Sequence, residues 1–145
     1  TSRRQRQMCI RDRFTVEELE EAMQKVMDQY AGGIGTHYQF NEKQLAMAEE
    51  KIKKLQILAK GLAAADMHEL MFIYELKERL TVCLTVIAHL RARKETRWHS
   101  FAENLDYPEK SDAWLCYVNS KKNGDQITMI RRDLVKGGET YEHRD

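Results

Sequence analysis

The stretch DMHELMFIYELKERLTVCLTVIAHL, residues 66–90, decides the fold of this 145-residue chain. Asp66 and Glu69 have the spacing of a capping box, in which two side chains satisfy backbone N–H groups at a helix start. Apolar residues then recur every three or four positions without a proline or glycine between them. This pattern predicts one helix over 67–94, about 40 Å long. Its apolar stripe consists of Leu70, Ile73, Leu76, Leu80, Cys83, Leu84, Ile87 and Leu90.

Two shorter amphipathic helices are predicted before the long one. Capping-box spacing recurs at Thr15 and at Asn41, ahead of apolar stripes over 16–30 and 45–62. The sequence AGGIG at 31–35 ends the first of them, because glycine tolerates the left-handed backbone that follows a helix C-terminus. Further apolar residues widen the buried face of the long helix. We therefore expect the two shorter helices and something more to cover it.

A β-hairpin is predicted at 114–135. Two β-rich runs flank Asn123-Gly124, a pair that accepts the positive φ needed in a two-residue hairpin turn. An isolated hairpin is only marginally stable in water, so this one needs a surface to lie on.

The predicted organisation is mainly α. A three-helix antiparallel bundle over 14–94 leads through a docking loop at 95–113 into the C-terminal β-hairpin, and the three parts form one domain over 14–135. Residues 136–145 are polar and are predicted to be a loose tail. Residues 1–13 hold five arginines and one aspartate without a helical period. We interpret them as a non-native or disordered basic tail.

Composition excludes several classes of protein. Residues 1–13 carry a charge of +4 and the remainder carries −3, within a net charge of +1. A nucleic-acid binder would depend on the basic tail, and we expect no nucleic-acid partner. No run approaches the roughly 18 apolar residues of a membrane span. The three cysteines contain no C-x-x-C pair, which excludes a zinc ribbon or a cluster ligated by this chain alone and indicates reduced thiols in a cytoplasmic protein.

No active site emerges from the residue patterns. The five histidines lack metal-ligand spacing, and carboxylates such as Glu49 and Glu50 precede lysines by four residues, as on a solvated helix face. The GGIG run at 32–35 follows a helix instead of a strand and precedes no Lys-Ser or Lys-Thr, so it fits neither phosphate-binding fingerprint. We predict no catalytic, cofactor-binding or metal-binding residue in this chain.

The segment after the long helix resembles a known family. ARKETRW at 92–98 is followed by DYPEKSDAWLCYVNS at 106–120. Similar glutamate–serine/threonine–arginine, aspartate–tyrosine–proline and tryptophan steps occur in the C-terminal domain of the fumarate reductase and succinate dehydrogenase flavoproteins. MQKVMDQYAGG at 23–33 and DMHELMFIYELKERL at 66–80 are similar to one branch of that family, the alpha subunits of dissimilatory adenylylsulfate reductases. The resemblance covers residues 16–135.

The resemblance implies that most of the parent protein lies outside this chain. In that family an N-terminal domain carries FAD, and the iron–sulfur clusters belong to a separate beta subunit. The parent would interconvert adenylylsulfate with sulfite and AMP, while this chain would be a non-catalytic C-terminal domain that packs on the FAD domain and is inactive alone. Trp98 follows Arg97 where dehydrogenase members usually have glycine, which argues against succinate dehydrogenase proper.

We predict that five residues after the long helix contact the missing FAD domain: Arg97, Trp98, Phe101, Tyr107 and Trp114. Interfaces favour Trp, Tyr and Arg, which bury much area while keeping a polar group. The alternative is that these side chains only fold the loop onto its own bundle. Two other functions stay open: the same domain of a fumarate reductase-type flavoprotein, and a free-standing helical interaction module. Such a module would show no exposed apolar patch.

Overall fold

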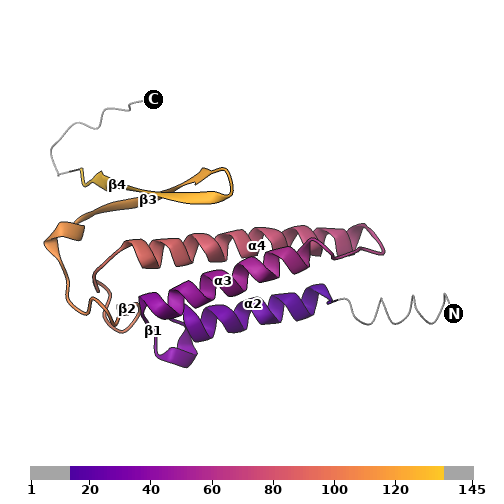
Figure 1. Cartoon of the computed structure of the whole chain (residues 1–145), viewed down its shortest axis with the longest axis horizontal. Coiled ribbons are helices and arrows are strands. Elements are labelled where there is room, and N and C mark those ends of the chain that lie inside the picture. The colour runs from indigo at the N-terminus through magenta and orange to yellow at the C-terminus, as the bar shows by residue number, and fades with distance from the viewer. Residues whose placement is uncertain (1–13, 136–145) are drawn as a thin grey trace.

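A computed structural model describes residues 14–135 and shows three antiparallel helices followed by a β-hairpin (Figure 1). This confirms the predicted mainly α fold. The predictions for residues 1–13 and 136–145 lie outside the described part. None of the helices within 14–135 is long and apolar enough to cross a membrane. The helices are α2 (Val16–Tyr30), α3 (Glu42–Ala59) and α4 (Met67–Ala92).

The predicted helix starts are confirmed by their capping hydrogen bonds. The side chains of Thr15, Asn41 and Asp66 each accept the backbone N–H three residues on, at 3.2, 2.8 and 2.9 Å. At the start of α4, the Glu69 carboxylate accepts the N–H of Ala65 at 2.7 Å, one residue before the predicted partner. These caps fix where each helix begins, and α4 ends two residues earlier than predicted.

The core lies where the predicted apolar stripes of the three helices meet. Each predicted stripe contributes at least two buried side chains, and α4 packs against both α2 and α3. One core residue, Phe40, comes from outside the helices and was not predicted. The buried apolar residues of the helices are Leu19, Met23, Leu45, Ala48, Ile52, Leu55, Ala59, Ile73, Leu76, Leu80 and Ile87.

Two very short strands tie the loop after α4 to the bundle. β1 (Gln39–Phe40) pairs in parallel with β2 (Glu103–Asn104). The N–H of Glu103 donates to the Tyr38 carbonyl at 2.9 Å, and the N–H of Leu105 donates to the Phe40 carbonyl at 2.8 Å. This pairing brings the α2–α3 connection and the loop together at one end of the bundle (Figure 1).

The hairpin lies along α4, on the side away from α2 and α3 (Figure 1). Its strands are β3 (Cys116–Asn123) and β4 (Gln126–Asp133). Val118, Ile127 and Met129 share one face of the antiparallel pair and are half-buried, whereas the opposite face is exposed. The hairpin therefore has the supporting surface that a two-stranded hairpin needs in water, but α4 covers it only partly.

The hairpin turn lies one residue later than predicted. Asn123 still pairs with Gln126, which leaves Gly124 and Asp125 as the two turn residues. Only Gly124 has a positive φ, at +62°, so Asn123 keeps the extended backbone of the strand. Because Asn123 remains paired in the ladder, the turn begins one residue later, at Gly124. A glycine adopts the left-handed conformation there without a steric penalty.

Replacing Gly124 tests this assignment. Gly124→Ala should lower the free energy of opening the hairpin by about 1 kcal/mol, because a Cβ is strained at positive φ although no atom lies within 4 Å of it. Gly61→Ala is the matched control, since Gly61 lacks a positive φ and its added Cβ meets the Leu58 carbonyl at an ordinary 3.5 Å. Native-state hydrogen exchange of the strand amides measures both effects, and equal effects would contradict the assignment.

Candidate interdomain contact site

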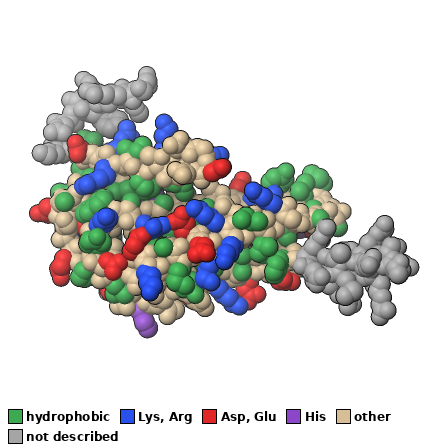
Figure 2. Space-filling view, viewed as in Figure 1, with side chains coloured by type: hydrophobic (Ala, Val, Ile, Leu, Met, Phe, Trp, Pro, Cys, Tyr) green, Lys and Arg blue, Asp and Glu red, His purple; other side chains and the backbone are tan. Residues whose placement is uncertain are grey.

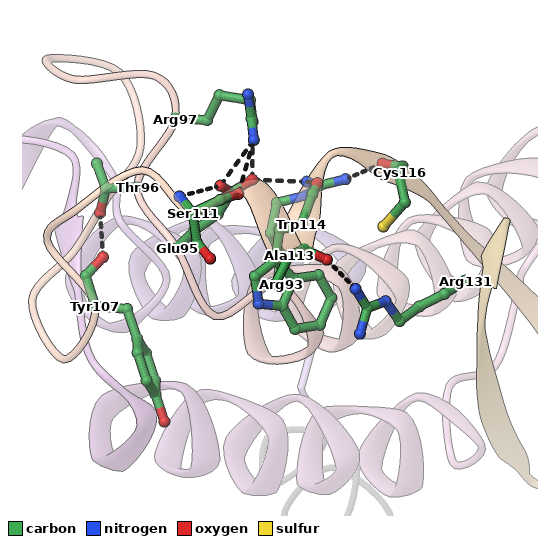
Figure 3. Close-up of polar contacts among 10 residues, drawn as sticks. All are labelled: Arg93, Glu95, Thr96, Arg97, Tyr107, Ser111, Ala113, Trp114, Cys116 and Arg131. Carbon is green, nitrogen blue, oxygen red and sulfur yellow. Dashed lines mark hydrogen bonds and ion pairs between the residues drawn. The ribbon is translucent and has the colours of Figure 1, made fainter. Parts of the chain in front are cut away.

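A buried carboxylate organises the segment that follows α4. The side chain of Glu95 is fully buried and accepts hydrogen bonds from both flanking arginines (Figure 3). Arg93 donates to it at 2.8 Å, and Arg97 donates through two nitrogens at 2.8 and 3.0 Å. The backbone N–H of Ser111 adds a fourth bond at 3.0 Å. We call these four residues the Glu95 cluster.

The Glu95 cluster keeps the carboxylate ionised. Burial alone would raise the pKa of Glu95, but the hydrogen bonds from Arg97, from the Ser111 N–H and from Arg93 outweigh it. Together they lower this pKa from 4.5 to about 2. The same contact raises the pKa of Arg97. The carboxylate is therefore held firmly in place. Hydrogen bonds between charged groups are strong, and breaking a buried ion pair leaves a charge without a partner.

The cluster also fixes the base of the hairpin. Arg93 donates to the carbonyl oxygens of Trp114 and Cys116, at 2.7 and 2.9 Å. Trp114 lies in a short 3₁₀ helix, η2 (Asp112–Trp114), so the first strand begins at Cys116, two residues later than predicted. The Arg131 guanidinium lies 4.2 Å from the centre of the Trp114 ring and donates to the Ala113 carbonyl. Trp114 therefore joins η2 to β4.

The rest of the loop is closed by a buried threonine. The Thr96 hydroxyl accepts the N–H of Asn104 at 3.0 Å. It also lies 2.8 Å from the Tyr107 carbonyl (Figure 3). The side chain of Asn104 in turn accepts the N–H groups of Asp106 and Tyr107, at 3.0 and 3.3 Å. The predicted docking loop is therefore an ordered element, since its buried polar groups are paired internally.

Two aromatic side chains of this loop remain uncovered. Trp98 is 69% exposed and Phe101 is 71% exposed. They lie in one tight turn, in which the Trp98 carbonyl accepts the N–H groups of Phe101 and Ala102. Tyr38, from the α2–α3 connection, is also exposed, and its ring centre lies 6.4 Å from that of Phe101. We call Tyr38, Trp98 and Phe101 the docking patch.

The backbone beneath the docking patch is strained. His37, Tyr38 and Ser100 have φ values of 54, 62 and 74°, a left-handed conformation that costs a non-glycine residue about 1–2 kcal/mol. The Glu103 carboxylate holds the strained turn by accepting the Ser100 N–H at 2.9 Å. Hydrogen bonding by Ser100 and Gln39 lowers the pKa of Glu103. Such strain persists where the surrounding contacts impose it.

The structure separates the five predicted contact residues. Trp98 and Phe101 are exposed together, whereas Arg97 and Trp114 make internal contacts within the loop and the hairpin base. Tyr107 is exposed on another side, where it lines a groove between the hairpin and the helices. Their contact with another domain stays a prediction. Sequence reasoning missed Tyr38, because only the β1–β2 pairing brings it to the loop.

The glycine-rich connection after α2 does not fit the pyrophosphate of FAD. The N–H of Gly35 donates to the Asp28 carboxylate at 3.0 Å. A Cβ added to Gly33 would lie 2.4 Å from the Asp28 backbone, so this glycine allows close packing. An anion would meet the negative charge of Asp28 here instead of free N–H groups. Among residues 14–135, no group of three or more His, Cys, Asp or Glu residues could hold a metal ion.

Comparison with known proteins identifies the class to which this fold belongs. The family model described as "Fumarate reductase flavoprotein C-term" matches residues 20–139. The chain therefore belongs to the family of C-terminal domains of fumarate reductase flavoproteins. The match includes most of α2, the whole of α3 and α4, the Glu95 cluster and the hairpin.

Within that class, the chain is similar to adenylylsulfate reductases. It is 34% identical to the adenylylsulfate reductase alpha subunit of Megalodesulfovibrio gigas over 98 residues, which is 67% of this chain and 15% of the relative. Adenylylsulfate reductase from Archaeoglobus fulgidus matches with a TM-score of 0.84 and 36% identity over 90% of this chain. An adenosine-5-phosphosulfate reductase in covalent complex with sulfite gives the same values. The chain spans 21% of each solved chain.

Neutralising Glu95 tests the role of the cluster. Glu95→Gln should lower the free energy of unfolding at neutral pH by about 3 kcal/mol, because a buried carboxylate is lost and two partly buried arginines lose their counter-ion. Urea denaturation measures the change. Glu50→Gln is the matched control, since the Glu50–Lys54 pair is exposed and its loss should change stability by less than about 0.5 kcal/mol. Similar losses in both variants would contradict the central role of Glu95.

The pH dependence of stability provides a second test. The pKa of Glu95 is about 2 in the folded chain and lies near 4.5 in the unfolded chain, so the folded state binds fewer protons. Its stabilisation is therefore complete above about pH 5 and decreases as the pH falls through 4.5 towards 2. The difference in unfolding free energy between the original chain and Glu95→Gln should shrink over this range. A constant difference would exclude an ionised, stabilising Glu95.

Proposed function

We propose that this chain is the C-terminal helical domain of the alpha subunit of an FAD-dependent adenylylsulfate reductase, and that it has no catalytic residue itself. The whole protein interconverts adenylylsulfate with sulfite and AMP in the cytoplasm. An N-terminal domain of the same polypeptide holds FAD, and a separate beta subunit holds iron–sulfur clusters. The observation that carries this proposal is the likeness to adenylylsulfate reductases over most of this chain and a fifth of theirs.

The role of this chain in that protein is to pack on the FAD domain through the docking patch. Trp98 and Phe101 expose large aromatic surfaces on an ordered, strained turn. Aromatic side chains held in a fixed conformation can bind a partner with little loss of conformational entropy. The buried polar groups of the loop form hydrogen bonds that hold the loop in shape, and they do not form a reactive site. The geometry thus supports a structural contact better than a catalytic one.

Exposed apolar residues argue against a free-standing module. Besides the docking patch, α4 exposes a row of large apolar side chains, which a self-sufficient bundle would cover. The row consists of Met67, Met71, Tyr74, Val82 and Val86. The fumarate reductase-type alternative is disfavoured, because the relatives named above are adenylylsulfate reductases.

A two-piece association experiment tests the docking role. The natural reading frame containing this chain is expressed as two polypeptides, the part before Phe14 and the chain from Phe14 onward. Trp98→Ala with Phe101→Ala should weaken their association about tenfold or more, as expected for central aromatic anchors. Isothermal titration calorimetry measures the affinity, and reduction of adenylylsulfate by the reassembled protein measures the function.

Tyr117→Ala is the matched control, because Tyr117 is an exposed aromatic residue on the outer face of the hairpin. It should leave the association unchanged. An unchanged affinity in the double variant would reject the docking patch. An upstream reading frame without a dinucleotide-binding glycine fingerprint would reject the flavoprotein assignment itself.

A further inference from the structure

A large open groove runs between the hairpin and the helices. Its volume is about 1630 Å³, larger than the 300–1,000 Å³ that small-molecule sites usually have. Leu84, Thr85 and Ala88 of α4 line it on one side, and Ile127 and Met129 of β4 line it on the other. In Figure 2, apolar side chains lie beneath the hairpin, with charged side chains along the helices below. We call this the hairpin groove.

The groove is positively charged although the domain is not. Residues 14–135 contain 17 Lys and Arg against 19 Asp and Glu, a charge of −2. The residues lining the groove include seven Lys and Arg against four Asp and Glu, a charge of +3. Six of the 11 lysines of residues 14–135 lie on it: Lys53, Lys60, Lys77, Lys94, Lys121 and Lys122.

Most of this positive charge is not neutralised within the described chain. Lys53 and Arg91 form ion pairs with Glu49, and Arg91 also with Glu42. Within residues 14–135, no carboxylate forms an ion pair with Lys60, Lys94, Lys121 or Lys122. These lysines therefore form a positively charged rim around the apolar lining of the hairpin groove.

The hairpin also lacks part of the cover that such an element needs. A two-stranded hairpin alone is marginal, and Val118, Ile127 and Met129 are only half-buried against α4. Whatever lies in the groove would complete the burial of this face. A nucleic acid would satisfy the lysines but not the apolar lining, whereas a polypeptide with both acidic and apolar side chains satisfies both.

We propose that the hairpin groove binds an acidic, apolar polypeptide segment supplied by a second protein chain. The leucines or similar side chains of that segment pack between α4 and β4, and its carboxylates meet the lysines of the rim. This site is separate from the docking patch and does not depend on the identity of the whole enzyme.

Designed peptides test the proposal on the intact chain. A short fluorescein-labelled peptide of glutamate and leucine should bind saturably, as followed by fluorescence anisotropy. Replacing its glutamates by lysines, or its leucines by serines, should weaken binding about tenfold or more. Lys121→Glu with Lys122→Glu should weaken binding of the original peptide about fivefold or more, since both charges are reversed at the rim.

Two control variants separate this site from other effects. Lys43→Glu with Lys110→Glu changes the charge equally at exposed lysines that do not line the groove, and should retain the affinity. Trp98→Ala with Phe101→Ala should also retain it, so failure of the docking role and failure of the groove are distinguishable. In the unaltered chain, the peptide should slow hydrogen exchange in β4, which reports binding even if a variant fails to fold.

Four results would overturn the proposal. These are absence of saturable binding, equal binding of the lysine or serine peptides, equal losses in the groove and control variants, and protection only of amides that lie away from the groove. Equal competition by a single-stranded DNA oligonucleotide would assign the groove to nucleic acid instead.

Discussion

The buried carboxylate of Glu95 is the interaction on which the rest of the structure depends. It receives bonds from the end of α4, from the loop and from the backbone just before η2. The other contacts of this segment join fewer parts of the chain: β1–β2 pairs only two residues, and Thr96 bonds within the loop. A charge is used here because one carboxylate can join three segments that share little apolar surface.

The direction of the hairpin follows from the same interaction. Arg93 bonds to Glu95 and to two carbonyls at the hairpin base, so the orientation of the strands is set at one end only. The other end, near Gly124, is held by partial packing on α4. The hairpin is fixed by hydrogen bonds at its base and is only half-covered along its length. A groove therefore lies between it and the helices, instead of a closed core. The groove and the ordered loop therefore have one physical origin.

The sequence predicted the helices because their signals are local. Thr15, Asn41 and Asp66 cap helices within four residues, and the apolar stripes depend only on helical period. The site was predicted less completely, since its residues meet through long-range contacts. RKETR places two arginines around Glu95, but only the folded loop buries that carboxylate. Tyr38 and Phe40 carried no periodic signal, because their positions depend on a two-residue strand pairing.

The separation of Arg97 from Trp98 shows how adjacent residues can serve different needs. Residue types that are common at interfaces are also the types that close a charged loop, so composition alone could not divide the five candidates. Their exposure distinguishes them. Arg97 is part of the Glu95 cluster, whereas the ring of Trp98 is largely exposed. A rigid polar interior beneath uncovered aromatic rings is the arrangement expected where one part of a protein is prepared for contact with another.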